Sequence, residues 1–138
     1  MTMSFEDIFD NREKKSYVRA RKYDVKITLN KNGHDRFSVR FGFLNDAAKA
    51  FASYDYIQFS NVEKLPGKIY FKLYEDRRYL DCYKLCLNGK KSETNRYAIL
   101  TPTENGEKIY RSKWVGKEFK IEFDSEHGLY YIDIDGAL

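Results

Sequence analysis

The segment VKITLNKNGHDRFSVRF, residues 25–41, contains two short runs in which apolar and polar side chains alternate. The runs cover residues 25–29 and 37–41 and flank the sequence Asn-Lys-Asn-Gly. Alternation with a period of two predicts a half-buried strand, and an Asn-Gly pair favours a tight turn between strands. The segment therefore predicts an antiparallel hairpin and, with it, a protein built around a sheet.

The same alternation continues along the chain and predicts further strands at residues 56–59, 69–74, 83–87, 96–100, 119–123 and 130–134. Asn45 and Asp46 could cap a helix running from Ala47 to Tyr54, whose apolar residues recur at spacings of three and four. Residues 101–116, which include Pro102, are expected to be irregular. The predicted fold class is α+β, mostly antiparallel sheet, with one short helix near residues 45–54.

The predicted elements fall into two related halves, residues 23–75 and 79–135, with a repeat of about 60 residues. Each half reads as strand, Asn-Gly turn, strand, intervening segment, strand, Gly turn and strand. Two interpretations are open: a duplicated, pseudo-dimeric chain, or the periodicity that any antiparallel sheet shows. The 138 residues predict one compact domain at 23–138, preceded by a basic arm at residues 1–22.

Several features point to a soluble protein of the cytoplasm. No apolar run approaches the roughly 20 residues that span a bilayer, and the acidic, polar start is unlike a secretion signal. On one strand Cys82 and Cys86 would lie about 13 Å apart, too far for a disulfide, so we expect reduced thiols. With only His34 and His127 besides, the sequence predicts no zinc site and no cofactor.

No catalytic motif is evident, and we expect a protein that is not an enzyme. The chain has no Gly-x-Ser-x-Gly, no phosphate-cradling glycine loop and no His-x-x-x-His. Asp133 and Asp135 share one strand face and could bind a cation, although a solvated acidic edge explains them equally simply. Both histidines read as solvated turn residues.

A more promising pattern lies opposite the apolar faces of the predicted strands, where lysine, arginine and tyrosine alternate. Basic side chains can neutralise phosphates, and tyrosine rings can stack on unpaired bases. We therefore predict a nucleic-acid-binding protein, with DNA favoured over RNA, that contacts phosphates through Lys26, Arg40, Lys72, Arg77, Arg78 and Lys84 and stacks bases on Tyr70 and Tyr74. The arm would add salt-sensitive affinity through Arg12, Lys14, Lys15, Arg19 and Arg21.

Residues 25–74 also resemble the swapped-hairpin unit of AbrB-type bacterial regulators in their order of strand, Gly turn, strand, short helix, strand, turn and strand. Tandem copies in one chain are similar to the MraZ-like version, and the element order is also similar to single-strand-binding folds of the Whirly and transcription-coactivator type. The resemblance implies DNA binding as a dimer or pseudo-dimer. The chain departs from the regulators in its turn, Gly33-His34-Asp35-Arg36, and in lacking a proline before Asn45.

The alternative is a small protein-binding module, such as a phage- or mobile-element-encoded inhibitor of a host enzyme. Small size and an excess of aromatic residues favour it, because Tyr and Arg also dominate protein hot spots. The acidic segment 118–135 could mimic nucleic acid or dock on a basic partner. Basic residues gathered on one sheet face would favour nucleic acid, whereas mixed charges around an exposed aromatic patch would favour a protein.

Overall fold

The computed structural model describes residues 22–32, 36–87, 95–101 and 104–138 and has the predicted α+β fold, mostly antiparallel sheet. Most of the predicted strands are confirmed to within a few residues at their ends. The strands are β1 (Val25–Asn32), β2 (Arg36–Phe43), β3 (Tyr56–Phe59), β4 (Lys68–Tyr74), β5 (Cys82–Lys84), β6 (Cys86–Leu87), β7 (Arg96–Leu100), β8 (Glu118–Phe119), β9 (Glu122–Asp124) and β10 (Leu129–Asp133). The helices are α1 (Asn45–Ala50), α2 (Glu104–Tyr110) and a final 3-10 turn (Ile134–Gly136).

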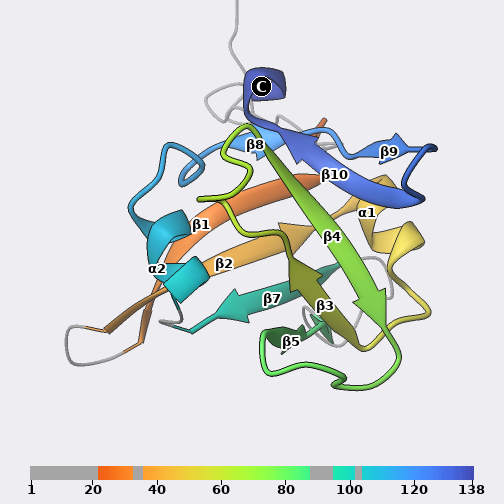
Figure 1. Cartoon of the computed structure of the whole chain (residues 1–138), viewed down its shortest axis with the longest axis horizontal. Helices are drawn as coiled ribbons and strands as arrows, with labels where there is room; N and C mark the ends of the chain where they lie inside the picture. Colours follow the sequence, from red (N-terminus) through yellow and green to blue (C-terminus); the bar gives the residue numbers. More distant parts are fainter. Residues whose placement is uncertain (1–21, 33–35, 88–94, 102–103) are drawn as a thin grey trace, which may run out of the picture.

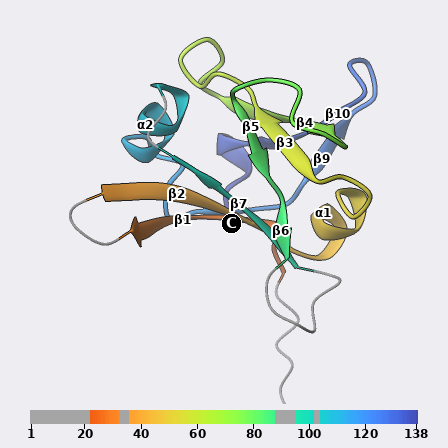
Figure 2. The same ribbon diagram turned by 90° about the horizontal axis from the view of Figure 1, so that it is seen from below.

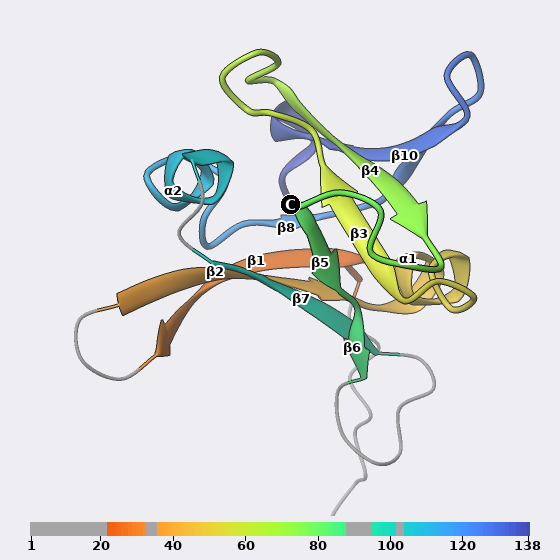
Figure 3. The same ribbon diagram turned by 60° about the horizontal axis from the view of Figure 1, so that its bottom comes forward.

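The strands form two five-stranded sheets that pack face to face (Figures 1 and 3). Sheet A has the order β6-β7-β2-β1-β8, and sheet B has the order β5-β3-β4-β10-β9. The predicted strands at 83–87 and 119–123 each divide in two: β5 and β9 lie in sheet B, whereas β6 and β8 lie in sheet A. The chain thus passes directly from an edge strand of one sheet to an edge strand of the other at both sides of the sandwich.

The topology divides the chain into two halves with the same order of hairpin, helix and hairpin. β2 pairs with β7 and β4 pairs with β10, so corresponding strands of the two halves meet in the middle of each sheet. β1 pairs with β8 and β3 pairs with β5, so the first strand of each half meets the third strand of the other. Exchanging the halves leaves this pairing order unchanged, as a pseudo-twofold axis requires.

Alternation explains why these segments form strands, because every second side chain enters the space between the sheets. Phe41 and Phe43 come from sheet A, and Phe59 and Phe71 come from sheet B; all are at most 5% exposed. Phe41 packs on Phe59 with 4.5 Å between ring centroids, and Phe43 packs on Phe71 at 5.6 Å. Part of the aromatic excess of the sequence therefore forms a core that both sheets share.

The helices require two corrections to the sequence-based predictions. Residues 104–110, expected to be irregular, form α2, which packs against β2 and buries Ile109. Gly106 lies in the middle of α2 and weakens its helical pattern, so tertiary packing rather than propensity supports this helix. The helices lie at opposite ends of the sandwich (Figure 2). No helix among the described residues combines the length and apolar character needed to cross a membrane.

The second correction concerns α1, which ends at Ala50 and lacks the predicted cap from its own first residues. Asn45 instead donates a side-chain hydrogen bond to the carbonyl of Tyr23, at 3.0 Å. The buried carboxylate of Asp24 accepts the backbone N–H of Asp46 at 3.3 Å and that of Ile121 at 2.9 Å. A remote acid thus supports the start of α1 and ties it to the segment joining the two sheets.

Candidate binding groove

The structure divides the residues predicted to bind nucleic acid between the two sheets. Lys26 and Arg40 lie on β1 and β2 in sheet A, whereas four others lie in sheet B: Tyr70, Lys72, Tyr74 and Lys84. Arg77 and Arg78 belong to the loop between β4 and β5. The arm residues Arg12, Lys14, Lys15, Arg19 and Arg21 lie outside the described residues. The predicted contact residues therefore do not share one sheet face, because alternation fixes the side of a strand but not its sheet.

On the outer face of sheet A, the two predicted cations already have partners. The Lys26 ammonium lies 3.7 Å from the Glu118 carboxylate, which the pairing of β1 with β8 brings beside it. The Arg40 guanidinium lies over the ring of Tyr97 on β7, 4.6 Å from its centroid. Both cations are thus engaged by residues from the second half of the chain.

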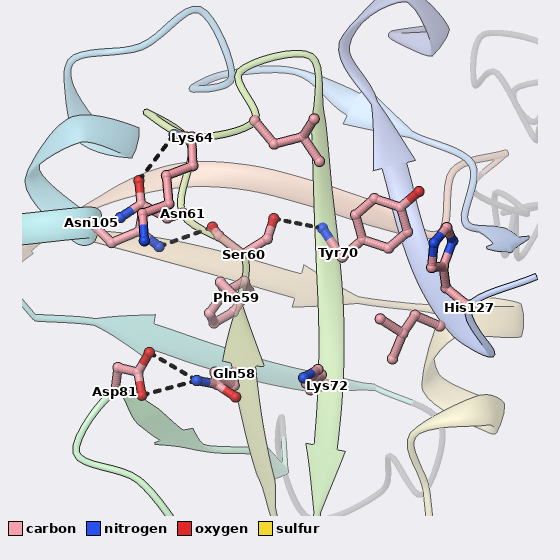
Figure 4. A pocket seen from close by; sticks show the side chains of 12 residues that line it. Gln58, Phe59, Ser60, Asn61, Lys64, Tyr70, Lys72, Asp81, Asn105 and His127 are labelled. Atoms are coloured by element: carbon pink, nitrogen blue, oxygen red, sulfur yellow. Dashed lines mark hydrogen bonds between the residues drawn. The ribbon is translucent and has the colours of Figure 1, made fainter.

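The outer face of sheet B carries an open groove with a volume of about 690 Å³ (Figure 4). Tyr70 and Lys72 on β4 lie beside β3 on its floor, because they alternate with the buried Ile69 and Phe71. The β3–β4 loop forms one wall, and the turn between β9 and β10 lies at the far end with His127. The groove therefore brings together segments from both halves of the chain.

Three hydrogen bonds fix the wall formed by the β3–β4 loop. The Asn105 side chain on α2 accepts the N–H of Val62 at 3.0 Å and donates to the carbonyl of Ser60 at 3.1 Å. The Ser60 hydroxyl accepts the N–H of Tyr70 at 2.9 Å and so ties the loop to β4. These bonds hold Lys64 and Asn61, which lie on the same loop, at the edge of the groove.

Tyr70, Asp124 and His127 form a hydrogen-bonded cluster at one end of the groove. The Tyr70 hydroxyl donates to Asp124 Oδ2 at 2.8 Å, and His127 Nδ1 lies 2.8 Å from the same oxygen. The bond to Asp124 raises the pKa of Tyr70 to about 12, and the bonds from His127 and Tyr70 lower the pKa of Asp124 to about 2. Asp124 in turn raises the pKa of His127, which favours its charged form.

Tyr74, the second predicted stacking residue, belongs to a network at the opposite end. Its hydroxyl donates to Gln58 Oε1 at 2.9 Å, and Gln58 Nε2 donates to both carboxylate oxygens of Asp81 at 3.0 and 3.1 Å. The Arg78 guanidinium lies 5.3 Å from the Tyr74 ring centroid, and Tyr79 meets the same ring edge-on at 5.9 Å. Burial is the main cause that raises the pKa of Tyr74.

The outer face of sheet B is divided by charge. On its strands the acids lie on β9 and β10 and the lysines lie on β4 and β5; Lys64 lies on the adjoining loop, and Asp81, just before β5, lines the groove. Among the described residues, Lys64, Lys72 and Lys84 have no carboxylate within ion-pair distance, and the salt bridges in this part of the chain involve other cations. The basic half of this face, which includes the groove, therefore offers cations that are not neutralised internally.

Several residues of the groove were not predicted as site residues from the sequence, namely Lys64, Asn61, Asn105 and His127. The first three lie in or beside segments without alternation, so no strand pattern could mark them. His127 was interpreted as a solvated turn residue, but it contacts Asp124 and lines the groove. The spacing Asp-x-x-His-Gly at 124–128 was the one available signal, since an Asp side chain often bonds a neighbouring turn residue.

The same turn contains the one cluster of possible metal ligands among the described residues. The ligand atoms of Asp124, Glu126 and His127 lie within 4.8 Å of one another. Asp124 Oδ2 is already engaged by Tyr70 and His127, so a cation at this oxygen would compete with both hydrogen bonds. The two cysteines are free thiols: Cys82 is buried in sheet B, and Cys86 lies in sheet A.

No family model, no curated protein and no solved structure matches this chain.

Proposed function

We propose that the protein binds single-stranded nucleic acid along the groove on the outer face of sheet B. The observation that carries the proposal is the position of Lys64 and Lys72, two cations without carboxylate partners among the described residues, in one groove with the Tyr70 ring. Lysines beside an aromatic ring suit a single strand, because the cations can neutralise phosphates while the ring stacks on an unpaired base.

A second hollow supports a binding path longer than one nucleotide. It has a volume of about 330 Å³ and shares Lys72 and Leu129 with the groove. Its lining continues along β4 to Tyr74. Lys72 thus lies between two adjoining hollows, where it could contact the backbone of a strand that occupies both. Contacts by Lys84, Arg77 and Arg78 beyond this path are part of the same proposal.

The test is fluorescence anisotropy with labelled single-stranded and duplex DNA and RNA, measured from low to moderate salt. We expect single-stranded probes to bind most tightly. Removing both groove cations in Lys64→Ala/Lys72→Ala should weaken binding roughly 10- to 25-fold at about 0.1 M salt and reduce the slope of log affinity against log salt by about 1.4. Tyr70→Ala should weaken binding by about 1–3 kcal/mol through the loss of stacking.

Lys26→Ala provides a matched control, because it removes one lysine from the other sheet, where Glu118 already lies beside it. Its effect should be less than twofold. An equal loss in Lys26→Ala and Lys72→Ala would show that the groove is not the binding surface. Absence of binding to all four nucleic acids at low salt would refute the proposed function.

A second candidate function, a protein-binding module such as an inhibitor of a host enzyme, rests on the loop between β4 and β5. Leu80 is 90% exposed and Tyr79 is 52% exposed on this loop. Arg77 donates to the Leu80 carbonyl at 3.3 Å, and Tyr79 packs on Tyr74, so the exposed residues are held in place. The loop thus presents an exposed tyrosine beside two arginines, the residue types in which protein hot spots are enriched, together with an exposed leucine that offers apolar area.

The two candidate functions predict that different variants abolish binding of the partner. If the chain is a protein-binding module, a protein that co-purifies with the wild-type chain should be lost with Leu80→Asp and retained with Lys72→Ala. Under the nucleic-acid proposal, Leu80→Asp should retain anisotropy binding to within about fivefold, because one added exposed charge changes such an interaction by less than about 1 kcal/mol.

A further inference from the structure

We propose that the groove is a phosphate-binding site in which Lys64, Asn61 and Lys72 donate to phosphate oxygens and His127 adds a contact only when protonated. The inference rests on the proposed function for the source of the phosphate, which would be the backbone of a bound strand. The kind of ligand follows from two sets of polar atoms in the groove: those that already form hydrogen bonds within the protein, and those that remain available to a ligand.

The neutral acceptors of the groove are occupied by internal hydrogen bonds. Gln58 Oε1 accepts the Tyr74 hydroxyl at 2.9 Å. Asn61 Oδ1 accepts the N–H groups of Glu63 and Lys64, at 2.9 and 3.4 Å. Asn105 Oδ1 accepts the Val62 N–H at 3.0 Å. A ligand that approaches these side chains therefore meets few oxygen atoms that can still accept a strong hydrogen bond.

Donors, by contrast, remain available. Asn61 Nδ2 and the ammonium groups of Lys64 and Lys72 make no recorded hydrogen bond to the described part of the chain. The Ser60 oxygen accepts the N–H of Tyr70, which leaves its own hydrogen free to donate. A groove whose unused groups are mainly donors and cations is complementary to an oxyanion with several acceptor oxygens, and phosphate is the one that nucleic acids supply.

Two carboxylates line or border the groove, and both are held at its ends. Asp81 accepts two hydrogen bonds from Gln58, and Figure 4 shows it at the end opposite His127. Asp124 is bonded by Tyr70 and His127, so the Tyr70 hydroxyl is directed at Asp124 and not at the ligand. Figure 4 shows Lys72 on β4 between these ends and Lys64 beside Asn61 at the edge of the groove, which leaves the middle of the groove for the anion.

His127 makes the contact dependent on pH. Nδ1 faces Asp124, so Nε2 is the nitrogen left for a ligand, and the side chain is 60% exposed. The charged and titratable groups around it are Asp124 and Glu126 on its own turn and Tyr70 on β4. Protonated His127 donates from Nε2, whereas neutral His127 presents a lone pair there when Nδ1 donates to Asp124. Phosphate should therefore bind more tightly as the pH falls through the raised pKa of His127.

The first experiment follows the imidazole protons of His127 by NMR from pH 5 to 9, with and without inorganic pyrophosphate at constant ionic strength in chloride. His127→Gln assigns the signal, and His34, the other histidine of the chain, serves as an internal control. We expect pyrophosphate to raise the pKa of His127 and to leave that of His34 unchanged. Equal shifts of both histidines, or no shift of either, would overturn the phosphate site.

The second experiment measures the affinity for a labelled single strand at pH 6 and pH 8 in the wild type, His127→Gln and His34→Gln. Binding by the wild type and by His34→Gln should tighten about two- to fivefold at pH 6, as for one added exposed ion pair. His127→Gln should lose this dependence. If His127→Gln retains it, the inference fails while the proposed function stands. If pyrophosphate shifts His127 but no strand binds, the phosphate site stands and the proposed function fails.

Discussion

On the outer face of sheet A, Lys26 lies beside Glu118 and Arg40 lies over Tyr97, whereas on the outer face of sheet B, Lys72 and Lys84 have no carboxylate partner among the described residues. The two faces have similar residue types, because lysine, arginine and tyrosine alternate with core residues in both. What differs is the neighbouring strand. In sheet A, β8 and β7 bring an acid and a ring to the cations.

This difference shows that the availability of a cation depends on which residue the neighbouring strand places opposite it. Lys72 lies opposite Gln58 on β3, and Lys84 lies opposite Tyr56, so neither meets an acid across the ladder. Lys26 lies opposite Glu118, which follows it by most of the chain's length. The proposed function and the phosphate site both depend on this contrast between the two outer faces.

The largest effect on stability should come from truncating a residue in the core that both sheets share. Phe71 on β4 is 1% exposed and packs against Phe41, Phe43 and Phe59 at centroid distances of 5.6 to 6.3 Å. Phe71→Ala should lower the free energy of unfolding by about 3–5 kcal/mol, because it leaves a cavity between the sheets. Urea denaturation followed by circular dichroism and by the fluorescence of Trp114 measures the loss.

The matched control for this prediction is Phe123→Ala, since Phe123 is 55% exposed and should cost less than about 1 kcal/mol. Both optical probes should report one transition in Phe71→Ala. Two separate transitions would mean that the two sheets unfold independently. The outer faces of sheets A and B would then belong to two units that are stable separately.

The next largest effect should come from Arg96, which links sheet A to the connection that leads into sheet B. Its guanidinium donates to the carbonyl oxygens of Ala52 and Tyr54, just after α1. Arg96→Met keeps much of the side-chain volume and removes both charge-assisted bonds, so we expect a loss of about 1.5–3 kcal/mol. Arg40→Met, which removes only a contact with Tyr97, should cost about 0.5–1 kcal/mol in the same denaturation assay.

Local patterns were enough to predict most strands and which side of each strand faces the core, because alternation is a property of neighbouring residues. They were not enough to show that residues 83–87 and 119–123 change sheets, since that depends on strands that pair from elsewhere in the chain. α2 was missed because its stability comes from packing on β2. The start of α1 was misassigned because its cap, Asp24, lies far upstream.

The residues of the candidate site were likewise predictable only where they lie on strands with clear alternation. Tyr70 and Lys72 were identified, because they lie on a strand whose buried face is evident from the sequence. Lys64 and Asn105 were not, because they reach the groove from a loop and a helix that only the tertiary fold brings together. The separation of Lys26 from Lys72 onto different sheets has the same cause.

A smaller effect is expected when a cation of sheet A is released from its partner. This change tests whether sheet A binds nucleic acid poorly because its cations are already paired. Glu118→Gln removes the carboxylate beside Lys26 and should raise the affinity for a single strand about two- to fivefold at low salt, with a steeper salt dependence. Glu107→Gln is the control, because it frees Arg111, which directly follows α2 and belongs to no strand of either sheet. Equal gains in both variants would mean that net charge, and not the face, governs binding.

The smallest effect concerns the ion pair between Asp124 and His127 at the edge of the groove. The pKa of Asp124 is lowered to about 2, so its contribution to stability is present above the ordinary pKa of an aspartate and is lost as the pH falls toward 2. The pKa of His127 is raised, so its contribution is complete below about pH 6.5 and is lost as the pH rises through the raised value.

The two groups together define a window between about pH 4 and 6.5 in which the charged pair stabilises the fold. Within this window the urea midpoint of His127→Gln should lie slightly below that of the wild type, and the difference should shrink toward both pH 2 and pH 9. The effect is small because the imidazole is 60% exposed and solvent screens the pair. A difference that stays constant with pH would mean that the turn is held by neutral hydrogen bonds, and His127 would then present no added positive charge to the groove at low pH.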